Sequence, residues 1–288
     1  MRDEVLIIGC GEIGVSLIEG WLNKKNEFSK RISSIHVLEK NSKRKNFLKK
    51  KYKKKIYFVG IDRIKKINKK FKYVFLSFKP KDLNSNLFFY KNLFDHNTIF
   101  YSVLAGKKLL DIKNFFPINK NIIRLMLNVP ISVNMGTIVF YSLKKNINKK
   151  ELFLLSIIGK IYELKNEKFF DLITAIVGSG PAYFYYLLES MEKAAIAYGL
   201  NKFLSKQILK GTYIGTAKII DNFEKNFEDL RKSVTSKGGT TEAAIKCLKE
   251  NNFQRLIYNS IKDSIKKTKI LEKNISILTC QKSFKLLS

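Results

Sequence analysis

Two glycines and two threonines, Gly238-Gly239-Thr240-Thr241, stand directly before an amphipathic segment in the last quarter of the chain. Glycine permits backbone conformations and close approaches that other residues do not, and the first N–H groups of a helix have no partner within it. The stretch can therefore seat a carboxylate on backbone amides, where the helix dipole also favours an anion. A simpler interpretation, which the residues alone favour, is that Thr240 or Thr241 caps the helix through its hydroxyl.

A second glycine pattern opens the chain. Residues 5–8 (Val-Leu-Ile-Ile) lead into Gly9-Cys10-Gly11-Glu12-Ile13-Gly14, and an apolar helical segment follows. G-x-G-x-x-G between a strand and a helix is the fingerprint of dinucleotide binding. Gly9 would make the turn, Gly11 would let a pyrophosphate approach the backbone, and Gly14 would let helix and strand pack closely. The alternative is a glycine turn that only closes a strand–helix unit.

Two acidic residues bear on this hypothesis. Glu12 suits the positive end of a helix but would repel a pyrophosphate, so we expect its side chain to turn outward. Glu39 ends the second predicted strand, where an acidic residue binds the ribose 2′-hydroxyl of NAD. Residues 40–44 (Lys-Asn-Ser-Lys-Arg) follow at once and could hold the extra phosphate of NADP. The sequence leaves the choice between NADH and NADPH open, and either charge can also be a solvated loop residue.

The elements that would position these loops follow from the apolar pattern. Short β-branched or aromatic runs predict strands at residues 5–8, 34–38, 56–59, 73–76, 98–103, 122–125 and 137–140. Their alternation with Lys-rich helical stretches indicates a mainly parallel sheet covered on both faces. Further along, Pro181 opens a long helix that Gly199 ends, and helices are predicted over residues 205–223, 241–250 and 253–273. The sequence thus predicts an α/β domain over residues 1–163 and an all-helical domain over residues 164–288.

Composition limits the function classes. The formal net charge is +31, but only seven of the 55 basic residues are arginine, and the lysines spread over every segment. We therefore favour a compositional bias over a nucleic-acid-binding stripe, and expect no specific nucleic-acid partner. Three scattered cysteines and two histidines show no disulfide or metal-ligand spacing, so we expect no metal. Without a secretory signal or an apolar run of about 18 residues, we expect a cytoplasmic protein with no membrane segment.

Taken in order, these motifs resemble the pyrroline-5-carboxylate reductase family, which carries out the last step of proline biosynthesis. The most specific segments are residues 174–183 (TAIVGSGPAY) and residues 234–241 (VTSKGGTT). Three further motifs fall where the family has counterparts: Lys79-Pro80, Ala105-Gly106 and Arg124-x-Met126-x-Asn128-x-Pro130. The chain departs from the family at Lys237 and Leu127, where the pattern has proline, and at Glu12, where asparagine or glutamine is common.

The resemblance implies a Rossmann-type dinucleotide-binding domain, followed by an all-helical dimerisation domain like the C-terminal domain of 6-phosphogluconate dehydrogenase. It implies reduction of 1-pyrroline-5-carboxylate to L-proline with NADPH or NADH, in a homodimer or a dimer-based oligomer. The implied cofactor-binding residues are Gly9, Gly11, Glu12, Ile13, Gly14, Glu39, Ser77, Lys79, Pro80, Ala105, Gly106 and Asn128. The implied substrate-binding residues are Ser233, Val234, Gly238, Gly239, Thr240, Thr241 and Glu224. The Thr241 hydroxyl would be the catalytic group at the ring nitrogen.

Two alternative functions remain open at this stage. One is another two-domain NAD(P)-dependent dehydrogenase, although such enzymes usually place a Lys or His acid–base in the helical domain, and no convincing one is found. The other is a non-enzymatic relic of the fold that binds a dinucleotide or nucleic acid. The Gly-Gly-Thr-Thr block favours the reductase.

Overall fold

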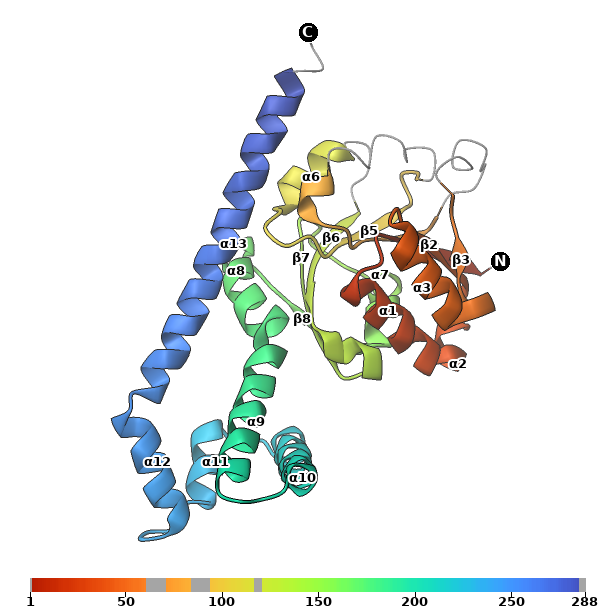
Figure 1. Ribbon diagram of the computed structural model, residues 1–288. Coiled ribbons are helices and arrows are strands. Elements are labelled where there is room, and N and C mark those ends of the chain that lie inside the picture. The colour runs from red at the N-terminus through yellow and green to blue at the C-terminus, as the bar shows by residue number, and fades with distance from the viewer. Residues whose placement is uncertain (1, 61–70, 84–93, 117–120, 285–288) are drawn as a thin grey trace. The chain divides into compact units, whose positions relative to one another are not determined.

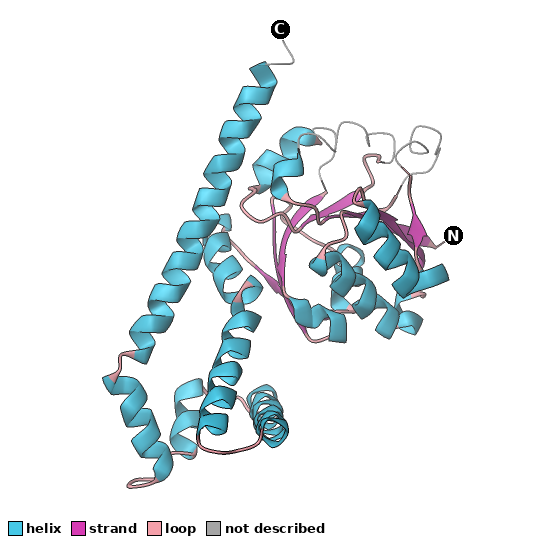
Figure 2. Ribbon diagram, viewed as in Figure 1, coloured by secondary structure: helices cyan, strands magenta, loops and turns pink. Residues whose placement is uncertain are grey.

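A computed structural model of the protein describes residues 2–60, 71–83, 94–116 and 121–284, with the backbone alone from residue 271 onward. The chain forms two compact units (Figure 1). The first comprises Met1–Ser179 together with Ser264–Ser288, and the second comprises Gly180–Asp263. Strands lie in the first unit, and the second is helical throughout (Figure 2). No described helix is long and apolar enough to cross a membrane.

The first unit is built on one eight-stranded sheet with the order β3-β2-β1-β4-β5-β6-β7-β8. The strands are β1 (Asp3–Ile8), β2 (Ile32–Leu38), β3 (Tyr57–Phe58), β4 (Tyr73–Leu76), β5 (Ile99–Ser102), β6 (Ile122–Leu127), β7 (Gly136–Ser142) and β8 (Gly159–Glu163). All neighbouring pairs are parallel except β6 and β7. The mainly parallel sheet and its seven predicted strands are confirmed. The eighth, β8, was not predicted because it is an edge strand with largely exposed side chains and no apolar run.

Alternating side chains of the strands supply two hydrophobic cores, one on each face of the sheet. Val5 and Ile7 of β1 face helices α1 (Glu12–Asn23), α3 (Ser42–Tyr52) and α7 (Lys149–Ser156). Leu6 and Ile8 of the same strand belong to the other core, which is closed by α6 (Leu109–Phe115). Burial on both faces explains why the central strands read as continuous apolar runs.

The described helices of the second unit begin with α9 (Gly180–Ala197), α10 (Lys202–Asn222), α11 (Phe227–Ser233) and α12 (Thr240–Glu250). The last helix, α13 (Phe253–Phe284), starts in this unit and runs beyond the predicted end near residue 273. Gly199 has a φ of +92°, which fits its predicted position after the end of α9. The short helix α11 was not predicted, because its seven residues include only two apolar ones, Phe227 and Leu230, which are too few to define an apolar stripe.

The segment that precedes α9 packs with the first unit. Glu167 accepts hydrogen bonds from Arg124 Nη1 and from the Leu109 amide, both at 2.7 Å. Phe170 lies under the Arg124 guanidinium, 3.8 Å from the ring centroid. These contacts bind residues 164–179 to the sheet. The compact units therefore divide after Ser179, whereas the predicted domains divide after residue 163.

The Arg124–Glu167 pair generates a stability prediction. The Arg124 side chain is only 4% exposed, so removing its carboxylate partner leaves a buried charge uncompensated. We expect Glu167→Ala to lower the free energy of unfolding of the first unit by about 3 kcal/mol. Trp21, the chain's one tryptophan, is fully buried in this unit, and its fluorescence during denaturant unfolding measures the change.

The matched control is Glu163→Ala, because Glu163 pairs with Lys165 at 2.6 Å where both side chains are exposed. Its loss should change stability by less than about 1 kcal/mol. Equal effects of the two substitutions would contradict the role given to the buried pair.

Candidate functional site

The carboxyl ends of four neighbouring parallel strands meet at one edge of the sheet. Four paired residues lie side by side there, at the ends of β2, β1, β4 and β5: Leu38, Ile8, Leu76 and Ser102. In the sheet, β1 lies between β2 and β4, so the chain continues from β1 to one side and later returns to the other side with β4. Such a reversal of strand order is the switch point at which open α/β sheets bind ligands. Gly9, Glu39 and Ser77 follow directly in sequence, so the structure brings these three predicted residues together.

Gly9 makes the turn that the glycine fingerprint requires. Its φ is +79°, and a Cβ atom added to it would lie 2.6 Å from Cβ of Phe78. The Ser77 hydroxyl donates to the Gly9 carbonyl, and the Gly9 amide donates to the Leu38 carbonyl at 2.8 Å. Only glycine fits this conformation and this distance. Ser77 therefore shapes the loop from the neighbouring strand.

Helix α1 begins at Gly11 without a side-chain cap. The first bond of the helix runs from the Val15 amide to the Gly11 carbonyl at 3.0 Å, so the amides of residues 12–14 have no acceptor within it. A Cβ on Gly11 would meet no atom within 4 Å, whereas one on Gly14 would lie 3.0 Å from Cys10 Sγ. Open space at Gly11 and close packing at Gly14 match the roles predicted for them.

Glu39 is turned onto the glycine loop. One carboxylate oxygen accepts from the Cys10 amide and the other from the Asn41 amide, each at 2.9 Å. The carboxylate is half-buried and held by two amides, although the bond to Asn41 is exposed. This fixed carboxylate ends β2 beside the loop.

Arg44, in the first turn of α3, contacts the same glycine loop. Its Nε donates to the Cys10 carbonyl at 2.9 Å, and its Nη2 pairs with Glu12 at 3.0 Å. The Glu12 side chain is 81% exposed, so it points outward as expected. Ile13 packs against the core, which leaves its amide as the group available at the start of α1.

The Cys10 thiol is not a candidate nucleophile. It is fully buried, and this desolvation is the main reason that its pKa rises from 9.0 to about 12. The thiol stays protonated near neutral pH, and the thiolate is the reactive form. Cys10 therefore contributes to the site through its backbone amide and carbonyl, which bond Glu39 and Arg44, and not through its thiol.

The remaining residues predicted for the cofactor line the same edge less directly. Lys79 is exposed in extended backbone before the 3₁₀ turn η2 (Pro80–Asp82), which Pro80 begins. Ala105 and Gly106 form a turn after β5, with a φ of +68° at Gly106. The Asn128 side chain accepts from the Thr137 amide at 3.0 Å, so it holds the turn between β6 and β7.

In the second unit, helix α12 begins at Gly239, again without a side-chain cap. Neither Thr240 nor Thr241 caps the helix, so the simpler interpretation of this stretch is wrong. The Ala243 amide donates to the Gly239 carbonyl at 3.3 Å, which leaves the amides of Thr240, Thr241 and Glu242 without an acceptor in the helix. This start can hold an anion.

Two of the three amides predicted to hold the carboxylate are occupied by the chain itself. The Gly238 amide donates to Glu242 Oε2 at 2.7 Å, and the Gly239 amide donates to the Ser236 carbonyl at 3.1 Å. Gly238 has a φ of +72°, which favours glycine. Gly238 and Gly239 thus shape the loop, and the amides without an acceptor in the chain begin at Thr240. The assignment of Gly238 and Gly239 to the substrate stays a prediction.

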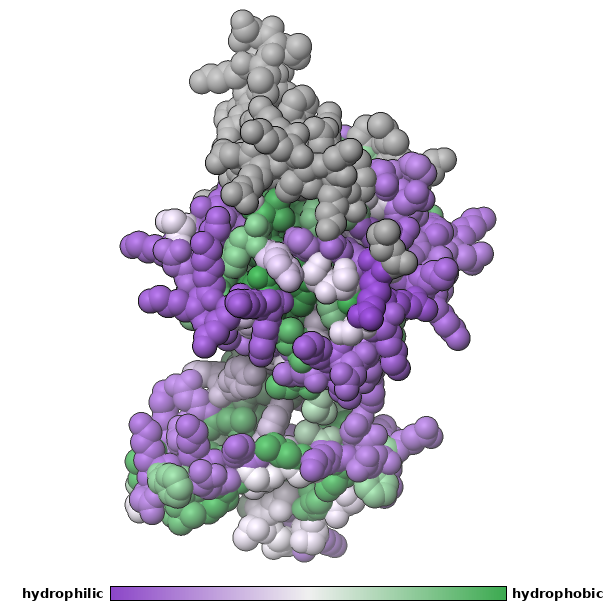
Figure 3. Space-filling model, turned by 90° about the vertical axis from the view of Figure 1, so that its right-hand side faces the viewer, coloured by the Kyte–Doolittle hydropathy of each residue, from purple (hydrophilic) through white to green (hydrophobic). Residues whose placement is uncertain are grey.

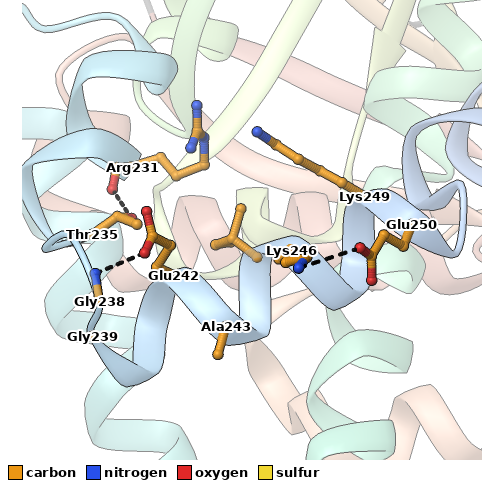
Figure 4. A pocket seen from close by; sticks show the side chains of 10 residues that line it. Arg231, Thr235, Gly238, Gly239, Glu242, Ala243, Lys246, Lys249 and Glu250 are labelled. Atoms are coloured by element: carbon orange, nitrogen blue, oxygen red, sulfur yellow. Dashed lines mark hydrogen bonds and ion pairs between the residues drawn. The ribbon is translucent and has the colours of Figure 1, made fainter.

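A cavity of about 680 Å³ lies against α11 and α12 (Figure 4). Arg231 and Lys249 reach toward the same space from the two helices, while Glu242 turns back to the Gly238 amide. Sequence reasoning missed Arg231, Lys249 and Glu242. Their signal was weak, because charged residues at helical spacing usually form a solvated face.

Other predicted substrate residues do not line this cavity. Thr241 lies one helical turn before Ile245, which lines the cavity, but Thr241 is not itself a lining residue. Ser233 donates its hydroxyl to the Leu230 carbonyl at 2.8 Å, and Val234 is 67% exposed at the end of α11. Glu224 is exposed in the segment between α10 and α11. Thr241 itself is half-buried at the start of α12.

A family model and several relatives of known function identify the family. Residues 167–271 match the family model described as pyrroline-5-carboxylate reductase dimerisation. Pyrroline-5-carboxylate reductase 2 of Bacillus subtilis is 34% identical over 199 residues, which cover 68% of this chain and 70% of that protein. The Staphylococcus haemolyticus pyrroline-5-carboxylate reductase is 27% identical over 280 residues, covering 94% of this chain and 98% of its own.

Two solved structures share the fold. The Plasmodium falciparum pyrroline carboxylate reductase with NADP bound has a TM-score of 0.76 at 22% identity, and covers 94% of this chain and 98% of its own. The Coxiella burnetii pyrroline-5-carboxylate reductase has a TM-score of 0.77 at 24% identity, with 94% and 99% covered.

The two glycines of the first loop should respond differently to an added methyl group. Gly9→Ala forces a positive φ and a clash with Phe78, so it should destabilise the first unit by at least about 2 kcal/mol. Gly11→Ala has room and an ordinary φ of −73°, so stability should hold while dinucleotide affinity falls about tenfold or more. Trp21 fluorescence in denaturant and dinucleotide titration measure the two effects. Unchanged dinucleotide affinity in folded Gly11→Ala would show that the loop binds no pyrophosphate.

Proposed function

The chain belongs to the pyrroline-5-carboxylate reductase family, and from this premise we propose how its residues reduce 1-pyrroline-5-carboxylate to L-proline with NAD(P)H. The substrate is a cyclic imine that carries a carboxylate. Its reduction requires a hydride at the imine carbon, a proton at the ring nitrogen and protein groups that bind the carboxylate. When bound, the reduced nicotinamide supplies the hydride. The protein's task is to bind and orient both molecules.

The glycine loop fits the pyrophosphate of the cofactor. The open space at Gly11 is where a Cβ would obstruct the approach of a phosphate, and the amides of residues 12–14 stand at the positive end of α1. Glu12 keeps its charge away by pairing with Arg44 at 3.0 Å. Lys79, Pro80, Ala105, Gly106 and Asn128 follow strand ends of the same sheet and remain proposed cofactor-binding residues.

The start of α12 is the proposed seat for the substrate carboxylate. Its Thr240 and Thr241 amides have no acceptor within the helix, and the helix dipole favours an anion there. The Thr241 hydroxyl can donate or accept a hydrogen bond, which suits it to the ring nitrogen. Ser233 and Val234 are exposed close by in sequence and would border the substrate. Glu224 remains a proposed neighbour on the resemblance alone.

A homodimer follows from the composition of the second unit. None of the buried hydrophobic residues of the described chain lies within residues 180–263, whereas Tyr186, Phe203 and Phe227 are 68%, 74% and 76% exposed. Apolar side chains reach the surface between charged ones over the helices at the bottom of Figure 3. An 84-residue helical unit without a core of its own needs a partner to bury this surface. A second copy of the chain meets that need, and the matched dimerisation model supports it.

The single observation that carries the function is the Gly238-Gly239-Thr240-Thr241 loop opening an uncapped helix in a chain of this family. A bare dinucleotide-binding relic would not need it, and another dehydrogenase would need an acid–base residue of its own. Family membership and the spread of the charge also argue against nucleic acid as the specific partner. The scattered cysteines support a cytoplasmic location.

Turnover tests the proposal directly. Purified protein should oxidise NADH or NADPH in the presence of 1-pyrroline-5-carboxylate and form proline in equal amounts. Absorbance of the reduced nicotinamide and product analysis measure the two. Folded dimeric protein that turns over neither cofactor would overturn the proposed function.

Removing the Thr241 hydroxyl should slow the reaction without loosening the cofactor. We expect Thr241→Ala to lower kcat about tenfold or more, because the ring nitrogen loses a hydrogen-bonding partner, while the cofactor Kd stays within about twofold. The matched control is Ser156→Ala, which removes an exposed hydroxyl from α7 and should leave kcat unchanged. An undiminished kcat in Thr241→Ala would leave this hydroxyl without a catalytic role.

A further inference from the structure

Glu39 contributes a fixed negative charge to a small cavity at the end of β2. The cavity holds about 80 Å³ and is lined by Ile8, Gly9, Leu38, Glu39, Lys40, Phe78 and Asp82. It lies at the strand ends beside the glycine loop, where the adenosine ribose of a dinucleotide is held in sheets of this type. Two carboxylates and one exposed lysine therefore line the cavity that would receive the part of the cofactor that distinguishes NADH from NADPH.

The two hydrogen bonds of Glu39 decide how this carboxylate can act. Its oxygens accept from the amides of Cys10 and Asn41, each at 2.9 Å, so the charge cannot swing away from the cavity without losing both bonds. A carboxylate has about four acceptor positions, which leaves capacity for a ribose hydroxyl. A phosphate in the place of that hydroxyl brings a second anion against a carboxylate that is already fixed.

Two groups that could receive a 2′-phosphate, the Asn41 amide and the Arg44 guanidinium, are used within the chain, whereas the exposed Lys40 lines the cavity. The Asn41 amide is bound by Glu39, and the Asn41 side chain accepts from the Arg44 amide at 2.9 Å. The Arg44 guanidinium is engaged by the Cys10 carbonyl and by Glu12, and lies 5.3 Å from the centroid of Phe47. Arg44 would thus have to lose three contacts before its guanidinium could bind a phosphate through two hydrogen bonds.

We propose that Glu39 makes this chain select NADH over NADPH. The overall charge of +31 acts in the other direction, since it attracts the more negative cofactor. At an ionic strength of 0.15 M, charges more than about 8 Å apart are largely screened, whereas a part-buried carboxylate within the ribose cavity is screened much less. The local charge therefore outweighs the general one. This inference rests on the proposed use of a nicotinamide cofactor.

Binding measurements test the selection independently of turnover. NADH and NADPH should each be titrated into the full-length wild-type protein at 0.15 M salt, by calorimetry and by nicotinamide fluorescence. We expect the Kd for NADH to be at least about tenfold lower than that for NADPH. Equal affinities, or tighter binding of NADPH, would overturn the proposal. Failure to bind either cofactor would also overturn it, whereas binding without turnover would contradict only the proposed reaction.

Substitution of Glu39 tests whether this residue causes the preference for NADH over NADPH. Glu39→Gln removes the charge, and Glu39→Ser removes the longer side chain as well, in case the glutamine amide disturbs the loop. Whichever variant retains the wild-type Trp21 fluorescence should lower the NADPH-to-NADH ratio of Kd values by about tenfold. The matched control is Glu27→Gln, which removes an exposed charge paired with Lys24 at 3.4 Å and should leave the ratio unchanged. A ratio unaltered in the folded Glu39 variants would contradict the role of Glu39.

Discussion

Each unit contains a helix that follows a glycine and has no side-chain cap, α1 in the first unit and α12 in the second. Helices α3, α7, α10 and α11 each begin at an asparagine whose side chain accepts from a backbone amide of the first turn. Helices α1 and α12 begin at Gly11 and Gly239 with no such bond. Glycine in place of a capping residue costs a helix only roughly a few tenths of a kcal/mol. In return, the first amides remain available to an anion, which we propose to be the pyrophosphate at α1 and the substrate carboxylate at α12.

Each glycine loop is also held by a carboxylate of the chain itself. Glu39 accepts from the Cys10 amide ahead of α1, and Glu242 accepts from the Gly238 amide ahead of α12. In both loops the bonded amide precedes the helix, so the amides of the first turn are left for the ligand. The two carboxylates fix loops that glycine alone would leave with many conformations. They also place a negative charge beside each seat, which sets how much further charge a ligand can bring.

Sequence reasoning recovered what short-range patterns determine. The seven predicted strands, the mainly parallel sheet, the turn at Gly9 and the close packing at Gly14 follow from apolar runs and from glycine spacing. Contacts between distant residues were not recoverable in this way. The Arg124–Glu167 pair, which binds residues 164–179 to the sheet, joins positions 43 residues apart. The Glu39 bond to the Cys10 amide spans 29 residues, and nothing in the spacing of a lone acidic residue distinguishes it from a solvated charge. The use of the Gly238 amide within its loop likewise depends on the direction of a side chain, that of Glu242.

The central claim is that the amides starting α1 and α12 hold the cofactor and the substrate for one reaction. A crystal structure of the assembled protein with NADH and proline, the product, tests it most directly. The account predicts that the proline carboxylate accepts from the Thr240 and Thr241 amides at about 2.7–3.2 Å. It also predicts that the reactive carbon of the nicotinamide lies about 3–3.5 Å from a ring carbon of proline. The carboxylate bound instead by Arg231 and Lys249, or the two seats facing apart in every subunit pairing, would contradict the account.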